Sequence, residues 1–270
     1  MNTTRILQER IRSAFATTAE PAVEAPDPSE LTKSSHACRG LDLAQRIATI
    51  RDFALGRVVF TTSFGIEDQA ITHAICSQAL AIDVVTLDTG RLFPQTYELW
   101  ERTERRYGWR IQAFYPDRGA AEVLVSHQGI NGFYTSVEAR HACCAVRKVE
   151  PLRRALAGAT AWITGLRADQ SDDRAGISFA AFDQQHRLIK VNPLFDWTRK
   201  QVLAFVREHG IPYSPLHDQG FLSIGCAPCT RAVPPGEPER AGRWWWEHEQ
   251  KKECGLHSRA SETSPEEAAS

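Results

Sequence analysis

Strand-like apolar segments alternate with helix-like segments from about residue 42 to residue 210, and this alternation constrains the fold more than any other feature. Strands that are separated by helices build a parallel sheet with helices packed on its faces. We therefore predict an α/β fold with a single doubly wound, mostly parallel sheet. Strands are expected at 57–64, 81–90, 109–117 and 159–167, and a hairpin at 179–183 and 187–195. Helices are expected at Glu67–Leu80, 94–108, Val146–Leu156 and 198–210.

The same pattern divides the chain into three parts. Residues 1–40 hold a predicted amphipathic helix at 3–16 and a linker rich in Ala, Pro and Glu at 19–30. Residues 41–235 hold the predicted sheet. Residues 236–270 form a C-terminal segment, and its polar end has the composition of a mobile, disordered tail.

The balance of charge restricts the partners of this chain. Its 32 basic and 33 acidic residues give a formal net charge of −1, which argues against nucleic acid as a ligand. No apolar run is long enough to span a bilayer, and the N-terminus lacks the apolar core of a signal peptide. We therefore expect a cytoplasmic protein without a membrane partner, whose thiols are reduced or bound to metal.

Five of the seven cysteines form a suggestive pattern. Cys143 and Cys144 are adjacent, Cys226 and Cys229 are separated by two residues, and Cys254 lies alone near the end. Four thiolates can hold an iron–sulfur cluster or a zinc ion. Structural zinc sites usually separate the members of a pair by two to four residues, which an adjacent pair does not do. The pattern favours a cluster, while zinc and a redox or purely structural role remain open.

Three loops follow predicted strands, at the edge where doubly wound sheets bind ligands. In the loop Ser63–Asp68, Gly65 allows close approach of a ligand and the helix start offers N–H groups to an anion, although a capped turn without a ligand fits equally well. Asp88 follows the next strand and can accept a hydrogen bond from a ribose or an adenine amine. Arg167 follows a later strand and suits either an anion or a solvated loop. The coincidence of three such loops favours a ligand site.

Cationic residues follow both cysteine pairs. Arg147 and Lys148 follow the adjacent pair, and Arg240 and Arg243 lie after the second pair. Arginine binds phosphate or sulfate with two parallel hydrogen bonds, whereas lysine acts as a point charge. A cluster held by four thiolates is negative, so a nearby lysine can bridge it to an anionic substrate. Taken singly, each of these residues is more often a solvated surface charge.

Seven motifs run from Ser63 to His257: SFGIED, LDTGRLFP, CCAVRKVEPL, GLRADQS, NPLFDWT, SIGCAPCTRAVPPGEPERAGRWWWE and KECGLH. In this order they resemble the assimilatory adenylyl-sulfate reductases, the iron–sulfur branch of the phosphoadenylyl-sulfate reductase family. The double cysteine, the later C-x2-C and the Cys-Gly-Leu-His end are together highly specific. The departures touch no motif cysteine or cation: Phe93 and Gln95 replace the expected His and Glu, and Ile66 replaces the usual Ala.

The resemblance implies a fold like that of the adenine nucleotide alpha hydrolases and the reduction of adenylyl sulfate (APS) to sulfite and AMP, in sulfate assimilation towards cysteine. It implies that a [4Fe-4S] cluster is bound by Cys143, Cys144, Cys226 and Cys229. It implies that the nucleotide site is bounded by Ser63, Gly65, Glu67, Asp68, Asp88, Gly90, Arg91 and Arg167. It implies that the phosphosulfate is contacted by Lys148, Arg240, Arg243 and His257.

The resemblance also implies that Cys254 is the nucleophile, carried on the mobile C-terminal segment. Its thiolate attacks the sulfur of adenylyl sulfate, AMP leaves, and a thioredoxin thiol then attacks Cys254 and releases sulfite. Lys251, Lys252 and His257 flank Cys254 and favour the thiolate. Because no thioredoxin-like domain is recognised in the sequence, thioredoxin is expected as an external electron donor. A homo-oligomer is also expected.

Three other functions remain open. A reductase of 3′-phosphoadenylyl sulfate (PAPS) resembles this chain but lacks both cysteine pairs, and dual use of APS and PAPS is also possible. A tRNA thiolase carries an S-G-G-x-D-S-like loop, whereas Ser63–Asp68 has one Gly and ends in Asp, and the chain has no basic excess. A zinc-stapled binding module would contain zinc and no iron.

Overall fold

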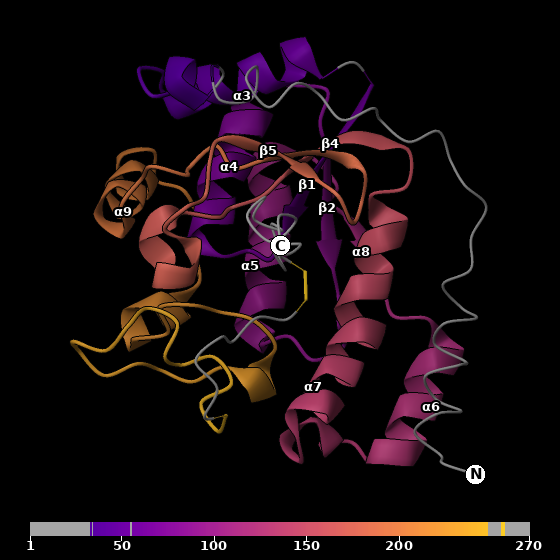
Figure 1. Cartoon of the computed structure of the whole chain (residues 1–270). Helices are drawn as coiled ribbons and strands as arrows, with labels where there is room; N and C mark the ends of the chain where they lie inside the picture. The colour runs from indigo at the N-terminus through magenta and orange to yellow at the C-terminus, as the bar shows by residue number, and fades with distance from the viewer. Residues whose placement is uncertain (1–32, 34, 55, 248–254, 257–270) are drawn as a thin grey trace, which may run out of the picture.

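A six-stranded sheet with the strand order β3-β2-β1-β4-β6-β5 forms the centre of the protein (Figure 1). The computed structural model describes residues 33, 35–54, 56–247 and 255–256. The strands are β1 (Arg57–Thr62), β2 (Asp83–Leu87), β3 (Gln112–Phe114), β4 (Ala159–Ile163), β5 (Ala180–Asp183) and β6 (Leu188–Val191). All neighbouring pairs are parallel except β5 and β6, which pair antiparallel. The predicted mostly parallel sheet and the terminal hairpin are confirmed.

Helices cover both faces of the sheet, as a doubly wound fold requires. One face packs Phe60 of β1 against Ile47 and Ile71, which lie on two helices, and against Val202 of a third. The opposite face packs Val59 of β1 against a different helix. Successive strand residues therefore point into separate cores. The helices are α3 (Leu43–Phe53), α4 (Ile66–Ser77), α5 (Pro94–Tyr107), α6 (Arg118–Gln128), α7 (Val137–Cys144), α8 (Glu150–Ala155) and α9 (Arg199–Glu208).

Among the described helices, α3, α6 and α7 were not expected from the sequence, and α3 and α6 begin at an aspartate cap. Asp42 accepts a hydrogen bond from the Gln45 backbone N–H at 2.8 Å and starts α3. Asp117 accepts one from the Ala120 N–H at 2.8 Å and starts α6, although the predicted third strand extended as far as residue 117. Such a cap satisfies N–H groups that the first helical turn leaves free. The predicted helix at 3–16 and the linker lie outside the described residues.

The adjacent cysteines lie inside a helix, not before one. The predicted helix began at Val146, but α7 begins at Val137, where the Ser136 side chain accepts from the backbone N–H of Ala139. A π-helical stretch, Ala145–Val149, joins α7 to α8, and Figure 1 shows all three as one continuous rod. Pro151, near the start of α8, has no N–H for a regular helical bond, which is consistent with an irregular turn before it.

The segment that follows Cys229 folds back over the cysteines. The Trp244 N–H donates to the Cys229 carbonyl at 3.2 Å, and the Arg231 N–H donates to the Gly242 carbonyl at 3.0 Å. Thr230 and Arg243 form an isolated antiparallel bridge. The predicted boundaries at residues 40 and 235 stay a prediction. None of the described helices is long and apolar enough to cross a bilayer.

Candidate active site

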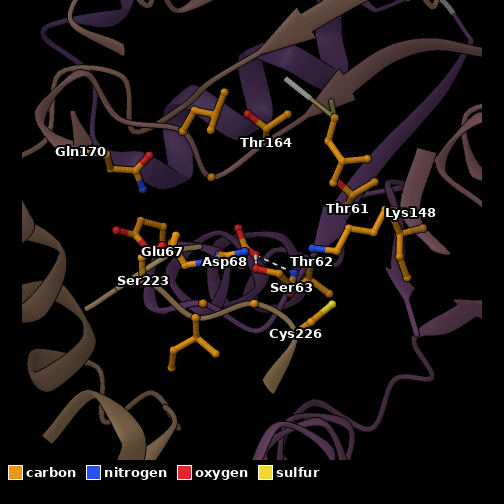
Figure 2. A pocket seen from close by; sticks show the side chains of 18 of the residues that line it. Thr61, Thr62, Ser63, Glu67, Asp68, Lys148, Thr164, Gln170, Ser223 and Cys226 are labelled. Atoms are coloured by element: carbon orange, nitrogen blue, oxygen red, sulfur yellow. Dashed lines mark hydrogen bonds between the residues drawn. The ribbon is translucent and has the colours of Figure 1, made fainter. Parts of the chain in front are cut away.

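A cavity of about 190 Å³ opens at the carboxyl ends of β1 and β4 (Figure 2). After β1 the chain continues to β2 and β3 on one side of the sheet, and after β4 it continues to β5 and β6 on the other side, so β1 and β4 border the point where the strand order reverses. This is the place where doubly wound sheets bind ligands. The loop after β1 contributes Ser63, Gly65, Glu67 and Asp68 to the lining.

The β1–α4 loop is held together by Asp68. Its Oδ2 accepts hydrogen bonds from the Ser63 N–H at 2.6 Å and from the Ser63 hydroxyl at 2.8 Å. Burial raises the pKa of Asp68 to about 7, although the bonds from Ser63 oppose that shift. Gly165, after β4, must lack a side chain, because a Cβ there would lie 2.2 Å from Asp68 Oδ1. The two loops at the reversal point therefore fit closely together.

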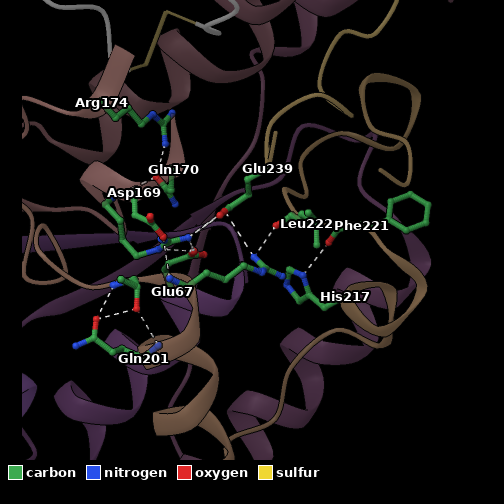
Figure 3. A network of polar contacts seen from close by, with 12 residues as sticks. Glu67, Asp169, Gln170, Arg174, Gln201, His217, Phe221, Leu222 and Glu239 are labelled. Atoms are coloured by element: carbon green, nitrogen blue, oxygen red, sulfur yellow. Dashed lines mark hydrogen bonds and ion pairs between the residues drawn. The ribbon is translucent and has the colours of Figure 1, made fainter. Parts of the chain in front are cut away.

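Arg167 is fully buried and is not among the residues that line the cavity. Figure 3 shows its partners Glu67, Asp169 and Glu239 close together. Its Nε donates to Glu67 at 2.9 Å, its Nη1 to Asp169 at 3.1 Å, and its Nη2 to both oxygens of Glu239 at 2.9 and 3.0 Å. A desolvated guanidinium needs such partners. The interpretation of Arg167 as a solvated loop charge is therefore wrong. Its direct contact with a ligand stays a prediction.

Asp88, Gly90 and Arg91 lie beside the cavity, not on its lining. Asp88 accepts hydrogen bonds from the Gly90 N–H and the Tyr97 hydroxyl, each at 2.8 Å. Arg91 donates to the Ile130 carbonyl and the Asn131 side chain, each at 2.7 Å. The residues of β2 and of the loop after it that do line the cavity are Thr86, Leu87, Thr89 and Leu92.

The four paired cysteines come together in one apolar cluster with Phe133 and Trp244, next to the cavity. Cys144, Cys226 and Cys229 are buried, and Cys143 is partly exposed. Among the described residues, no group of three or more His, Cys, Asp or Glu side chains could hold a metal ion. The cysteines also line a small pocket with the cations Arg91, Arg140, Arg147, Lys148 and Arg243.

Cys226 joins this cysteine pocket to the larger cavity, because it lines both. Its sulfur lies 3.3 Å from the Thr89 hydroxyl. Burial opposes ionisation of Cys226, but the charge of Lys148 and the Thr89 hydrogen bond bring its pKa below the ordinary value. Burial and the neighbouring Cys226 raise the pKa of Cys229 to about 11. In Figure 2, Lys148 and Cys226 lie at the end of the cavity away from Glu67 and Gln170.

Arg240 and Arg243 both line the cavity. Arg243 is 6 % exposed, its guanidinium lies 4.7 Å from the Trp244 ring centre, and its buried Nε has no hydrogen-bond partner in the described part of the chain. Gly225 permits this packing, because a Cβ there would lie 2.3 Å from Arg243 Nη2. A buried cationic nitrogen without a partner is costly, so this position suits an anionic ligand.

Cys254 and His257 lie outside the described residues, as do Lys251 and Lys252. The two residues between Cys254 and His257 are described. Leu256 lines the cavity and packs against both the apolar cluster that contains Leu152 and the cysteine cluster.

The sequence did not reveal two buried ion pairs near the cavity. Arg140 and Glu247 pair at 2.7 Å, with side chains only 1 % and 3 % exposed. Glu239 pairs with Arg167. No local pattern distinguishes Glu239 from Glu237, which is exposed and two residues away. Arg140, four residues before Cys144 on a helix, could have been placed beside the cysteines if the helix had been predicted.

Comparisons with known proteins agree with this geometry. Residues 57–232 match the family described as "Phosphoadenosine phosphosulfate reductase domain". The adenosine 5′-phosphosulfate reductase of Agrobacterium fabrum is 56% identical over 226 residues, which cover 84% of this chain and 86% of that protein. The protein of the same name from Allochromatium vinosum is 49% identical over 253 residues, which cover 94% and 92%.

The chain therefore belongs to the phosphoadenosine phosphosulfate reductase family. It is an enzyme, an oxidoreductase that acts on a sulfur group, and the resemblance drawn from its motifs is confirmed. A crystal structure of phosphoadenylyl-sulfate (PAPS) reductase from Candida auris has the same fold, with a TM-score of 0.67 at 24% identity over 78% of this chain and all of that one.

Proposed function

We propose that this enzyme reduces adenylyl sulfate to sulfite and AMP in sulfate assimilation towards cysteine, with thioredoxin as the electron donor. One observation carries the proposal: at the reversal point of the sheet, a single cavity is lined by the loop after β1, by Cys226 and by three cations, Lys148, Arg240 and Arg243. The relatives named adenosine 5′-phosphosulfate reductase support the choice of substrate. A cytoplasmic location and a homo-oligomeric state are part of the proposal.

The proposal includes a [4Fe-4S] cluster held by Cys143, Cys144, Cys226 and Cys229. The donor set is four thiols in an apolar pocket, and cations border it to offset the charge of bound thiolates. A cubane presents four separate iron atoms, so its ligands do not need to converge on one point as the ligands of a single ion do. When bound, the cluster would add negative charge beside the cavity, and Lys148 would face both that charge and the substrate.

The proposal assigns the residues of the site to two parts of the substrate. The loop Ser63–Asp68 would hold the nucleoside through its backbone and hydroxyl groups, and Asp88, Gly90 and Arg91 would border the nucleotide site. Lys148, Arg240 and Arg243 would hold the phosphosulfate, together with His257. The partnerless Nε of Arg243 supports this assignment, because an anionic oxygen would satisfy it.

The chemistry assigned to Cys254 is nucleophilic substitution at sulfur. The thiolate forms a bond to the sulfate sulfur, the bond from that sulfur to the bridging oxygen breaks, and AMP leaves with the electron pair. Cations at the phosphate stabilise the charge that develops there. A thioredoxin thiolate then attacks the Cys254 sulfur, sulfite leaves, and the resulting mixed disulfide is resolved by the second thioredoxin thiol. The position of Leu256 at the cavity supports a role there for Cys254, which lies two residues earlier in the chain.

The test is an anaerobic assay of the purified protein with adenylyl sulfate, reduced thioredoxin and thioredoxin reductase. We expect sulfite and AMP in equal amounts. Without thioredoxin we expect no sulfite, and AMP only up to one per enzyme chain. A parallel assay with PAPS distinguishes the alternative substrate. Sulfite from PAPS alone, or no sulfite from either substrate, would contradict the proposal.

A further inference from the structure

Glu239 lies in an unusual position, and the proposed function gives this residue no role. It lines the cavity near Arg240, yet an acidic side chain repels an anionic substrate. Its carboxylate is 12 % exposed and pairs with Arg167 at 2.9 Å, and it also lies 3.6 Å from the Arg199 guanidinium. Such burial indicates that Glu239 acts on its own segment of the protein, not on the ligand.

Arg167 is a rigid anchor for this carboxylate. It is fully buried, and besides Glu239 it binds Glu67 at the start of α4 and Asp169 after β4. These contacts fix the guanidinium to the carboxyl edge of the sheet. Because both oxygens of Glu239 accept from the same Nη2 at 3.0 and 2.9 Å, that side chain has a defined place relative to the sheet.

Glu239 and Arg240 are the two central residues of one tight turn. The Ala241 N–H donates to the Pro238 carbonyl at 2.9 Å, which closes a four-residue turn, and the Arg243 N–H donates to the Arg240 carbonyl at 2.9 Å in the next turn. The central residues of a closed turn have little independent freedom. Holding the Glu239 side chain therefore also orients the backbone that carries Arg240.

We propose that Glu239 is a positioning residue, which is anchored on Arg167 and orients Arg240 toward the phosphosulfate. The inference rests on the proposed function, because that function makes Arg240 a contact of the phosphosulfate. It also gives Arg167 an indirect role in substrate binding, in place of the direct contact expected from the sequence.

Binding of AMP and adenosine tests this proposal without turnover. The two ligands differ by the phosphate, so a residue that acts through Arg240 affects only AMP. Titration calorimetry on the anaerobically purified full chain should show that Glu239→Gln weakens AMP about tenfold, the loss expected from one weakened charge-assisted hydrogen bond, and leaves adenosine unchanged. Glu237→Gln, an exposed carboxylate two residues away in the same segment, should change neither affinity. Equal losses for both ligands, or no loss of AMP affinity, would overturn the inference.

A double-mutant cycle shows whether Glu239 acts through Arg240. In an Arg240→Ala background, Glu239→Gln should cause no further loss of AMP affinity, whereas independent effects would add and contradict the inference. Should Glu239→Gln fail to fold, Glu239→Asp should give the same selective loss of AMP affinity, since a shorter side chain cannot keep both contacts. Equal affinities of the wild-type protein for AMP and adenosine would show that the cavity does not bind the phosphate. That result would contradict the proposed function as well.

Discussion

The two charged regions that border the cavity differ in how their charges are balanced. Around Arg167, carboxylates from Glu67, Asp169 and Glu239 surround the buried guanidinium. In the cysteine pocket, Arg140 pairs with Glu247, but among the described residues Arg91 and Arg147 donate to neutral oxygens and Arg243 Nε has no partner. A region whose charges are already paired supports the structure, whereas an excess of cations over carboxylates suits bound anions.

The largest effect is expected from the cysteines. Purified protein should contain about four iron and four sulfide per chain, and Cys226→Ser should lose the iron and nearly all activity. The matched control is Cys76→Ser, a partly buried thiol on α4 outside the pocket, which should keep both. Iron analysis and visible absorbance of anaerobic protein measure this. Full iron content in a Cys143→Ser, Cys144→Ser double variant would show that these residues are not ligands.

Removing Arg167 should mainly destabilise the protein. Arg167→Met leaves Glu67 and Glu239 buried without their partner, which should lower the free energy of unfolding by about 3–5 kcal/mol. Arg105→Met removes an exposed pair with Glu101 on α5 and should have no measurable effect. Urea unfolding followed by fluorescence compares the two variants. A loss below about 1 kcal/mol for Arg167→Met would contradict a structural role for this network.

The cations that face the cavity should affect catalysis more than stability. Lys148→Ala, Arg240→Ala and Arg243→Ala should each reduce kcat/KM for adenylyl sulfate by an amount equivalent to about 1.5–3 kcal/mol, as for a lost hydrogen bond to a charged group. Arg231→Ala is the control, because Arg231 lies two residues after Cys229 but does not line the cavity. Steady-state rates of sulfite release measure the change. Wild-type rates in all three variants would make these residues ordinary structural charges.

A smaller effect is expected from the pH dependence of stability at Asp68. Burial raises its pKa to about 7, so the folded state holds this proton more tightly than the unfolded state does. Stability from this residue is therefore present at low pH and is lost as the pH rises from about 4 to above 7. Asp68→Asn lacks this titration. Between pH 6 and 8 its free energy of unfolding should rise by about 1 kcal/mol relative to wild type, and a parallel pH dependence in the two proteins would refute the shift.

The sheet could be predicted from the sequence, because strand propensity and helix signals agree along most of the chain. The helices α3 and α6 were missed although Asp42 and Asp117 were visible cap residues, since the neighbouring apolar patterns are weak. The position of the cysteine pair inside a helix was also missed. It depends on Ser136 as a cap and on a π-helical stretch, and local propensity does not indicate the latter.

The site was predicted as a set of loops, but not as a set of contacts. The edge of the sheet and the motifs led to the cavity-lining residues Ser63, Asp68, Lys148 and Arg243. The partners of Arg167 could not be predicted, because Glu67 and Glu239 are 100 and 72 residues away from it in the chain. Pairings over such distances in sequence depend on the folded packing and leave no local signal.

The central claim is that Cys254 carries the sulfonate, and mass spectrometry tests it most directly. After the anaerobic protein is mixed with adenylyl sulfate alone, the peptide containing Cys254 should gain one SO3 group, and AMP should be released in a stoichiometric amount. Reduced thioredoxin should remove the group and yield sulfite. Cys254→Ser should keep its iron and its AMP affinity but form no adduct. An adduct on a different cysteine, or sulfite production by Cys254→Ser, would contradict the account.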